Sequence, residues 1–209
     1  KPFEILIFAP DNDTLDAGKK QFSKNKNIKF IKDEGKGKPA ALNLAFKKAK
    51  GNILILTDGD VYISENAISP LIEQLKDQSV GAVSGRPVPQ ESRNSKYGYW
   101  AHFLLKTANE ERIKRDRENR FILLSGYLFA MRNVIKHIPE DVLDDAFISQ
   151  LIWKKGYKIA YEPKAEVYIK NPSNLKDWLK QKRRNTSGDL NIRNHLGKIE
   201  LDFNPETID

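Results

Sequence analysis

The sequence predicts an α/β fold in which a mostly parallel sheet is flanked by helices. Along the first half of the chain, short apolar and β-branched runs alternate with segments of helical periodicity. This alternation is typical of βαβ units, whose parallel strands are joined by helices. The 209 residues include no cysteine and are 39% hydrophobic. A chain of this size can bury a core without disulfides, and the absence of cysteine excludes thiolate metal sites and cysteine nucleophiles.

The predicted elements of the first half follow one another closely. The apolar runs that predict strands lie at 3–9, 28–31, 53–57 and 80–83. The segments with a helical spacing of apolar residues lie at about 14–24, 39–50 and 67–76. The second helix begins at Pro39, a residue that suits a first helical turn. Because 53–57 is the most apolar run, we expect that strand at the centre of the sheet.

The second half of the chain is less regular. Helices are predicted at 97–117, 146–155 and 174–185, and strands at 121–124, 127–131 and 157–161. No linker divides the chain, so we expect one domain over residues 1–188 and a tail, 189–209, with little periodic signal. No apolar run approaches the roughly 18 residues that would span a bilayer.

The chain is basic, with 36 Lys and Arg against 28 Asp and Glu and a net charge of +8. Such a balance suits a phosphate-bearing ligand, a nucleic acid or an anionic membrane surface. Two basic segments stand out, one at 106–120 and one at 180–184. We expect mainly solvated helix faces there, and the alternative is a surface for anionic lipid or for a polyprenyl phosphate.

Two carboxylates follow the most apolar strand. Asp58 and Asp60 flank Gly59, and the ligands of open α/β sheets bind beyond the carboxyl ends of the strands. Carboxylate oxygens are the ligands that Mg²⁺ and Mn²⁺ prefer, and such an ion can neutralise a diphosphate leaving group. The alternative is an Asp-Gly turn with solvated carboxylates.

A basic loop and a second acidic pair accompany this motif. Lys36 and Lys38 lie at the start of a predicted helix, where anions are favoured, and are candidates for phosphate contact. The alternative is a solvated turn. Asp144 and Asp145 lie just before another predicted helix. One of these carboxylates is a candidate general base, and the alternative is a helix N-cap.

The order of these motifs resembles inverting glycosyltransferase family 2, whose members have the GT-A fold. The matching segments lie at 37–43, 58–60, 125–126, 144–145, 156–159 and 181–184. They read Gly-Lys-x-x-Ala-Leu-Asn, Asp-Gly-Asp, Ser-Gly, Asp-Asp, Gly-Tyr-x-Ile and Gln-x-x-Arg. The set covers roughly residues 3–188. The resemblance therefore implies a single GT-A-like catalytic domain of the nucleotide-diphospho-sugar transferase class.

The resemblance also implies roles on the donor side of the site. Asp58 would lie near the ribose and diphosphate of a nucleotide, and Asp60 would coordinate Mg²⁺ or Mn²⁺. Gln181 and Arg184 would flank the cleft, where an arginine can hold a diphosphate through two parallel hydrogen bonds. Asp11, which follows the first predicted strand, would contact the nucleobase.

On the acceptor side, Asp145 would be the base that deprotonates an acceptor hydroxyl for direct displacement at the anomeric carbon. Ser125, Gly126 and Asp144 would line the acceptor side of the site. The implied activity is metal-dependent transfer of a sugar, with inversion, from a nucleotide-diphosphate sugar to a glycan or lipid-linked acceptor. The implied location is cytoplasmic, at the cytoplasmic face of a membrane, with peripheral membrane contact and no nucleic-acid partner.

The chain departs from the family pattern in two places. It opens at the strand that resembles the family's second, so we expect the family's first strand to lie outside it. Asn185 stands where the Gln-x-x-Arg-Trp motif has tryptophan, which weakens the case for processive polymer synthesis. The rival functions are a metal-dependent nucleotidyltransferase, a basic nucleic-acid-binding domain, and a folded but inactive fragment.

Overall fold

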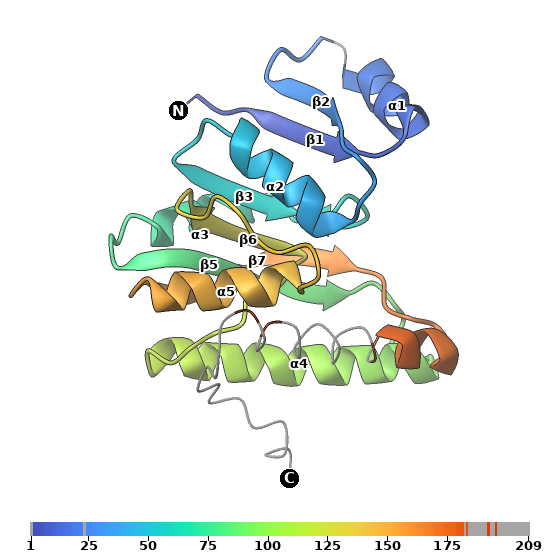
Figure 1. The fold of residues 1–209 in the computed structure, drawn as a ribbon. Helices are drawn as coiled ribbons and strands as arrows, with labels where there is room; N and C mark the ends of the chain where they lie inside the picture. Colours follow the sequence, from blue (N-terminus) through green and yellow to red (C-terminus); the bar gives the residue numbers. More distant parts are fainter. Residues whose placement is uncertain (1, 23, 182, 184–191, 193–194, 196–209) are drawn as a thin grey trace.

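The computed structural model describes residues 2–22, 24–181, 183, 192 and 195, and it divides the strands between two sheets. In the smaller sheet, β1 (Ile5–Ala9) runs parallel to β2 (Ile28–Lys32). The two strands are joined by α1 (Asn12–Phe22). Figure 1 shows this unit in blue at the top of the molecule. It is the βαβ unit that the alternating pattern predicts.

The larger sheet has five strands in the order β3-β6-β5-β7-β4. The strands are β3 (Ile53–Thr57), β4 (Tyr62–Ile63), β5 (Val80–Pro89), β6 (Leu128–Arg132) and β7 (Lys158–Ile169). β5 and β7 run parallel, whereas β6 is antiparallel to both of its neighbours and β4 is antiparallel to β7. The predicted α/β class is confirmed. The parallel arrangement, however, holds only for β1–β2 and β5–β7 among the described pairings.

The direction of β6 cannot be read from its sequence. Leu128 and Ala130 belong to one core cluster, and Phe129 and Met131 belong to the other, as expected for side chains that alternate across a strand. All four are buried. A strand buried on both faces is a continuous apolar run whichever way it is oriented, so the antiparallel pairing leaves no signal in the pattern.

Two expectations about strands are wrong. β3 lies at an edge of the five-stranded sheet and not at its centre: it pairs with β6 alone among the described strands, and Ile55 is 37% exposed. An apolar run reports the burial of side chains and not the number of strand partners. Residues 121–124 form no strand, although Ile122 and Leu124 are buried. The backbone N–H of Leu124 bonds instead to the side chain of Ser149.

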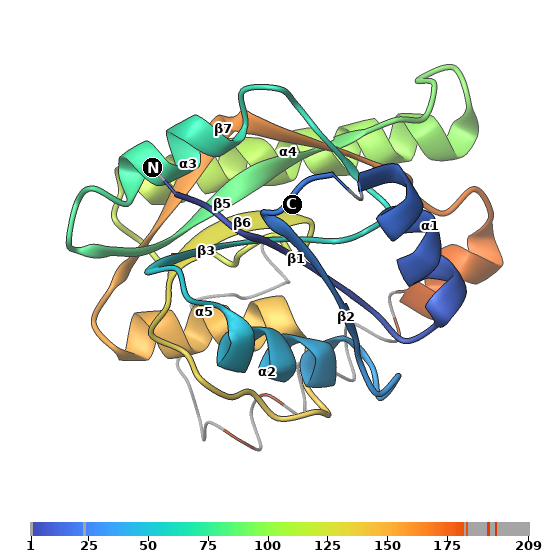
Figure 2. The same cartoon turned by 90° about the horizontal axis from the view of Figure 1, so that it is seen from above.

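Helices cover both faces of the larger sheet. They are α2 (Lys38–Lys48), α3 (Ile68–Gln74), α4 (Lys96–Arg117) and α5 (Asp144–Lys154). Figure 2 shows α3 and α4 on one side of the strands and α2 and α5 on the other. One core cluster joins α5 to the sheet through residues such as Phe147 and Ile148, and a second joins α3 through Leu71 and Leu75. α5 begins two residues earlier than predicted, so its first turn contains the acidic pair.

The C-terminal region is described in part. Residues 175–181 are helical, inside the helix predicted at 174–185. Beyond residue 188, Ile192 is buried in the core cluster that includes α5, and His195 Nε2 lies 2.8 Å from Asp141 Oδ1. These two residues of the expected tail therefore pack against the domain. Within the described ranges, no helix combines the length and the apolarity needed to cross a bilayer.

Candidate active site

The ammonium group of Lys38 joins three segments that are far apart in the sequence. Its Nζ lies 2.7 Å from Asp58 Oδ1, 3.1 Å from Asp144 Oδ2 and 3.4 Å from the carbonyl oxygen of Gly126. Lys38 opens α2, Asp58 follows β3, Gly126 precedes β6 and Asp144 opens α5. The fold therefore brings together four of the predicted site residues at the carboxyl end of β3.

The charges in this cluster compensate one another. Burial alone would lower the pKa of Lys38, but the negative charges of Asp144 and Asp58 outweigh it and raise that pKa above its usual value. Lys38 is therefore charged at neutral pH. Asp144 Oδ2 is a buried atom that lies within ion-pair distance of Lys38 but makes no hydrogen bond in the described part of the chain. The charge of Lys38 is therefore what stabilises this buried oxygen.

Asp145 lies beside this cluster and is held by two backbone groups. The N–H of Gly126 donates to Asp145 Oδ2 at 3.1 Å, and the N–H of Ala146 donates to Oδ1 at 2.8 Å. Neither Asp145 nor Asp144 is the N-cap of α5, because that position belongs to Leu143. Burial, followed by the neighbouring charge of Asp144, raises the pKa of Asp145. A carboxylate with a raised pKa is a better proton acceptor at neutral pH than an ordinary aspartate.

Position 126 requires a glycine because of Asp145. A Cβ atom on residue 126 would lie 2.9 Å from Asp145 Oδ2, which is closer than van der Waals contact allows. The neighbouring backbone is fixed as well. The N–H of Ser125 donates to Ser84 Oγ at 3.0 Å, and Ser149 Oγ donates to the carbonyl oxygen of Asp145 at 2.6 Å. The Ser-Gly segment and the first turn of α5 are therefore held in one fixed arrangement.

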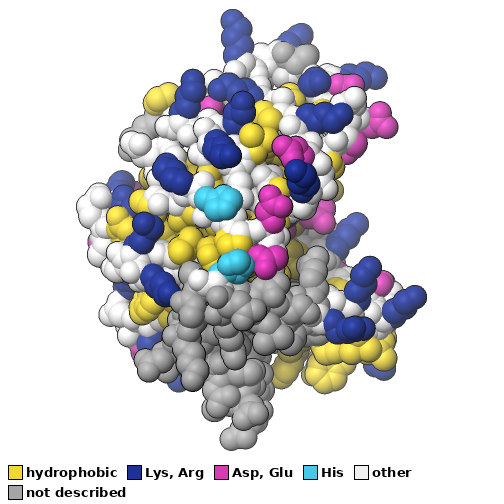
Figure 3. All heavy atoms as spheres, viewed as in Figure 1, with side chains coloured by type: hydrophobic (Ala, Val, Ile, Leu, Met, Phe, Trp, Pro, Cys, Tyr) yellow, Lys and Arg dark blue, Asp and Glu magenta, His cyan; other side chains and the backbone are white. Residues whose placement is uncertain are grey.

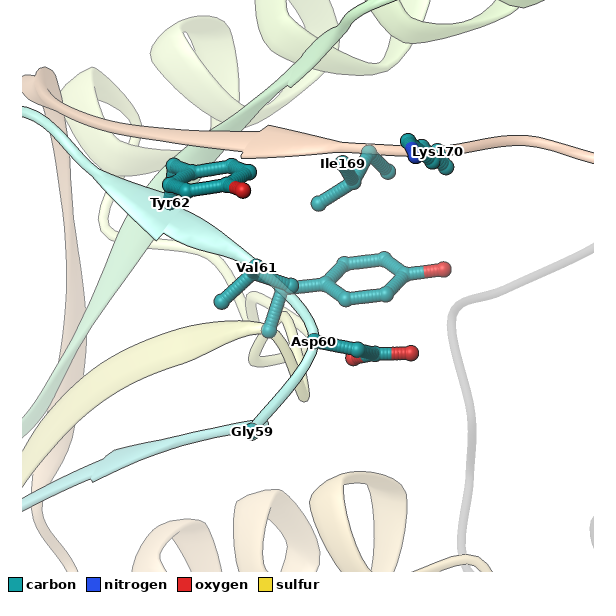
Figure 4. A pocket seen from close by; sticks show the side chains of 7 residues that line it. Gly59, Asp60, Val61, Tyr62, Ile169 and Lys170 are labelled. Atoms are coloured by element: carbon teal, nitrogen blue, oxygen red, sulfur yellow. The ribbon is translucent and has the colours of Figure 1, made fainter. Parts of the chain in front are cut away.

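Asp60 lines a cavity of about 320 Å³ next to this cluster. The cavity is lined by Gly59, Asp60, Val61, Tyr62, Tyr127, Ile169 and Lys170. Figure 4 shows the loop that carries Asp60 facing the end of β7, where Ile169 and Lys170 lie. Tyr127 directly follows Gly126, and its carbonyl oxygen accepts a hydrogen bond of 2.9 Å from Thr57 Oγ1. The cavity of Asp60 and the cluster around Asp145 therefore share the backbone at residues 126–127.

The residues of this site fit a divalent cation that arrives with phosphate. Among the described residues, no three His, Asp or Glu side chains gather into a group that could hold a metal ion alone. Mg²⁺ is commonly bound through one or two carboxylates together with substrate phosphates. Asp60 is exposed at the cavity and is in no ion pair with another described residue. Its carboxylate suits such a shared coordination by protein and diphosphate.

Of four further predicted site residues, the three that the structure describes are not among the ion-pair or hydrogen-bond partners of Lys38. Asp11 accepts hydrogen bonds from the backbone N–H and the hydroxyl of Thr14 at the start of α1, and these bonds lower its pKa. Lys36 is exposed and pairs with Glu34 at 2.6 Å. Gln181 is half-buried at the end of the helical segment 175–181. Arg184 lies outside the described residues. The roles expected of these four stay predictions.

Arg112 is a site neighbour that the sequence interpretation missed, because it lies in a basic segment expected to be solvated. The structure half-buries it, with its guanidinium carbon 6.0 Å from the centre of the Tyr161 ring. Burial lowers its pKa, while Tyr161 and the negative charge of Asp145 oppose that change. Its burial could have been inferred from the helical spacing, because Arg112 lies on the same covered face of α4 as Ala101 and Leu105.

Comparison with known proteins agrees with this geometry. The pattern of glycosyl transferase family 2 matches residues 2–138. An N-acetylglucosaminyltransferase of Azorhizobium caulinodans is 23% identical over 205 residues, which cover 85% of this chain and 50% of that protein. A poly-beta-1,6-N-acetyl-D-glucosamine synthase of Staphylococcus epidermidis is 27% identical and covers 80% of this chain, with 42% of that protein matched. The chain thus spans about half the length, or less, of these relatives.

Solved structures show the same fold. The mannosyltransferase PcManGT of Pyrobaculum calidifontis, solved in complex with GDP-Man and Mn²⁺, has a TM-score of 0.71 at 20% identity. That likeness covers 93% of this chain and 56% of the other. GalNAc-T7, solved with UDP, GalNAc and Mn²⁺, has a TM-score of 0.58 at 17% identity, over 80% of this chain and 37% of the other. Both neighbours have the GT-A fold, which confirms the predicted architecture. Because the family pattern matches more than half of its residues, the chain belongs to glycosyl transferase family 2.

Proposed function

We propose that this chain carries the catalytic site for transfer of a sugar from a nucleotide-diphosphate sugar to an acceptor hydroxyl, with metal dependence and inversion. The observation that carries the proposal is the convergence of Asp58, Asp144 and Asp145 around Lys38, next to the cavity of Asp60. A diphosphate leaving group needs positive charge, which we assign to Lys38 and to a cation at Asp60. An alcohol nucleophile needs a base, which we assign to Asp145.

In this proposal, Asp145 removes the proton of the acceptor hydroxyl. The N–H groups of Gly126 and Ala146 hold its carboxylate in place, and the raised pKa strengthens it as a base. Asp144 shares Lys38 with the carbonyl oxygen of Gly126, which supports a role beside Ser125 and Gly126 on the acceptor side. Attack from this side, opposite the leaving diphosphate, gives inversion in one displacement.

On the donor side, Asp60 would hold Mg²⁺ or Mn²⁺ together with the diphosphate, and such an ion would supply positive charge to the leaving group. Asp58 lies near the ribose and diphosphate, and Lys38 turns from the carboxylates toward the phosphates when the donor binds. Lys36, which pairs with Glu34, is a further proposed phosphate contact, and Gln181 and Arg184 of the Gln-x-x-Arg motif are proposed to flank the diphosphate.

The donor and the acceptor are proposed by class. The two structural neighbours were solved with GDP-Man and with UDP, so a UDP- or GDP-sugar is the donor class to test. Several relatives are named for N-acetylglucosamine transfer, which makes that sugar the first choice. The acceptor is a hydroxyl of a glycan or of a lipid-linked sugar, reached at the cytoplasmic face of a membrane.

Nucleotide binding with and without metal tests the proposal. Isothermal titration of the chain with UDP or GDP is expected to show binding that strengthens when Mn²⁺ is present. Thermal stabilisation should follow the same dependence, because a ligand that binds only the folded state raises its stability. Absence of any nucleotide binding with Mn²⁺ present would contradict the proposal. Tight, salt-sensitive binding to oligonucleotides without nucleotide binding would favour the alternative function, a nucleic-acid-binding domain.

A further inference from the structure

The N-terminal half of α4 exposes large apolar side chains away from the core. The covered face of this half contains Gly98 and Ala101, which are buried where α4 packs on β5 and β7. The outer face carries four residues between 40% and 58% exposed: Tyr99, Trp100, Phe103 and Leu104. Their spacing of three and four places them along one stripe of the helix. We call these four residues the α4 patch.

The α4 patch is preformed. The rings of Tyr99 and Trp100 meet edge to face at 6.0 Å, and those of Trp100 and Phe103 meet edge to face at 6.2 Å. Aromatic side chains that pack on one another in water, and not on a core, form a contiguous apolar surface. A contiguous exposed apolar surface commonly marks an interaction site, whereas apolar residues scattered singly over a surface do not.

The charges around the patch are mainly positive. From Ser92 to Asn109 the chain contains Arg93, Lys96 and Lys106 and no aspartate or glutamate. Lys106 lies 3.7 Å from Glu110, one turn beyond the patch, and both side chains are exposed. Cations therefore outnumber anions along the apolar stripe, which favours contact with a negatively charged surface.

A second apolar and basic strip lies toward the same end of the molecule. In the helical segment 175–181, Leu175 and Leu179 are one turn apart and are 57% and 48% exposed, with Lys176 and Lys180 next to them. Figures 1 and 2 both place this segment and the beginning of α4 toward the right-hand end. Figure 3 shows hydrophobic side chains with Lys and Arg around them at the lower right of the molecule.

We propose that the α4 patch docks the protein on an anionic lipid surface. Tryptophan and tyrosine favour the boundary between water and acyl chains, because each has an apolar ring and a polar group. Lysine and arginine at the rim are attracted by negative headgroups. A protein partner would also cover the apolar stripe, but the excess of cations over anions between residues 92 and 110 matches an anionic membrane better than a neutral protein surface. This inference rests on the membrane-face location in the proposed function and names the surface responsible for it.

Vesicle sedimentation tests the inference. The full chain is expected to pellet with vesicles of equimolar phosphatidylcholine and phosphatidylserine, and to remain in solution with phosphatidylcholine alone. The double variant Trp100→Ser/Phe103→Ser should bind the anionic vesicles at least about tenfold more weakly, since two aromatic rings no longer insert. The control is Phe22→Ser, an exposed aromatic outside the patch, and it should bind as the unaltered chain does.

A charge variant separates the two contributions. Lys96→Gln/Lys106→Gln should weaken binding to anionic vesicles roughly thirtyfold at low salt. Each basic residue near an anionic membrane raises the affinity by about five- to sixfold, and the variant removes two of them. A cooperative thermal melt close to that of the unaltered chain serves as the folding check for every variant. Because neither this check nor the vesicle assay uses a nucleotide, a failed nucleotide response leaves the vesicle result standing.

Three outcomes would overturn the inference. They are failure of the full chain to pellet with anionic vesicles, equal pelleting with both vesicle types, and undiminished binding by the Trp100→Ser/Phe103→Ser variant. Concentration-dependent dimerisation that this double variant abolishes, without vesicle binding, would assign the patch to a second copy of the chain.

Discussion

The carboxylate cluster around Lys38 and the α4 patch are built in opposite ways. The cluster takes residues from α2, β3, the loop before β6 and α5, and nearly every polar atom in it has a partner. The α4 patch takes its residues from one helix and leaves its apolar side chains in water. The cluster therefore depends on the whole fold, whereas the patch depends on little besides a stable helix.

This difference predicts which property, activity, stability or surface association, a substitution in each region should change. In the cluster, a change in one group alters the position or the pKa of its neighbours, so activity should respond strongly and stability moderately. In the patch, the side chains make few contacts inside the protein, so stability should hardly respond while association with a surface does. The predictions below test this contrast, from the largest expected effect to the smallest.

The largest effect is expected for Asp145→Asn. Loss of the proposed base should lower turnover by about 10²–10⁴-fold, the usual contribution of general base catalysis. Nucleotide affinity should change little, because the base acts in the transition state. The melting temperature should change little, because removal of a charge that the folded protein disfavours offsets the loss of one of the two N–H bonds, since asparagine has a single acceptor oxygen. Initial rates of sugar transfer and thermal melts measure these effects.

The matched control is Asp16→Asn, which makes the same exchange at an exposed aspartate of α1 paired with Lys19. It should leave turnover unchanged. If Asp145→Asn transferred sugar as fast as this control, the role proposed for Asp145 would be wrong.

Asp60→Asn should remove the metal dependence of nucleotide binding. The amide keeps the size of the carboxylate but loses its charge, which a divalent cation requires of its ligand here. Isothermal titration with and without Mn²⁺ is expected to give the same weak affinity for the variant in both conditions. A variant that still bound the nucleotide more tightly with Mn²⁺ would show that another group holds the ion.

Gly126→Ala should slow the reaction without unfolding the protein. The added methyl group lies 2.9 Å from Asp145 Oδ2 and must push the carboxylate aside. A displacement of that kind typically costs about tenfold to a hundredfold in rate. The expected pattern is a lower kcat with a nearly unchanged KM for the donor. A loss confined to donor KM would place Gly126 on the donor side instead.

Lys38→Met should shift the pH dependence of the reaction. The charge of Lys38 lowers the pKa of Asp145, against the dominant effect of burial, so its removal should raise that pKa further. Activity requires the ionised base and is lost as pH falls through its pKa in the folded state. The acid limb of the rate profile should therefore move to higher pH. An unchanged acid limb would mean that the titrating group is not Asp145.

The stability of this variant should depend on pH in the direction set by linkage. A carboxyl group whose pKa is raised by folding favours the folded state at low pH, and this contribution is lost as pH rises through the folded-state pKa. Lys38→Met should be less stable than the unaltered chain by about 1 kcal/mol at neutral pH, because Lys38 is 42% exposed and its pairs are partly screened. Denaturant unfolding at several pH values measures this loss.

The smallest effect on stability is expected for Phe103→Ser in the α4 patch. Phe103 is 51% exposed and lies on the outer face of α4. An exposed substitution of this kind changes the free energy of unfolding by at most about 0.5 kcal/mol. Denaturant unfolding should therefore give nearly the same midpoint as for the unaltered chain. A loss of several kcal/mol would mean that the patch belongs to the core and is not a free surface.

Much of the site could be predicted from the sequence because its parts are local motifs. The Asp-Gly-Asp turn follows β3, the acidic pair opens α5, and the Ser-Gly segment precedes β6, whose first residue pairs with the last residue of β3. Those positions converge in an α/β fold. The alternation of strands and helices predicted the α/β class for the same reason.

Contacts and strand pairings between segments that are far apart in the chain could not be predicted from the sequence. The bridge from Lys38 to Asp58 and Asp144 depends on how α2 and α5 are placed on one side of the sheet, and the motif alone favoured phosphate contact for this lysine. The antiparallel direction of β6 and the edge position of β3 depend on chain routing and not on side-chain pattern. The half-burial of Arg112 depends on Tyr161, which lies 49 residues away in the sequence (161 − 112).

The central claim is that the metal-binding and proton-accepting groups face each other across one site. A crystal structure with a nucleoside diphosphate and Mn²⁺, located by its anomalous signal, tests this most directly. The account predicts the ion between Asp60 and the diphosphate, in the cavity lined by Tyr127, with the carboxylate of Asp145 open to the same space. An ion bound away from Asp60, or a nucleotide on the far side of the sheet from Asp145, would contradict it.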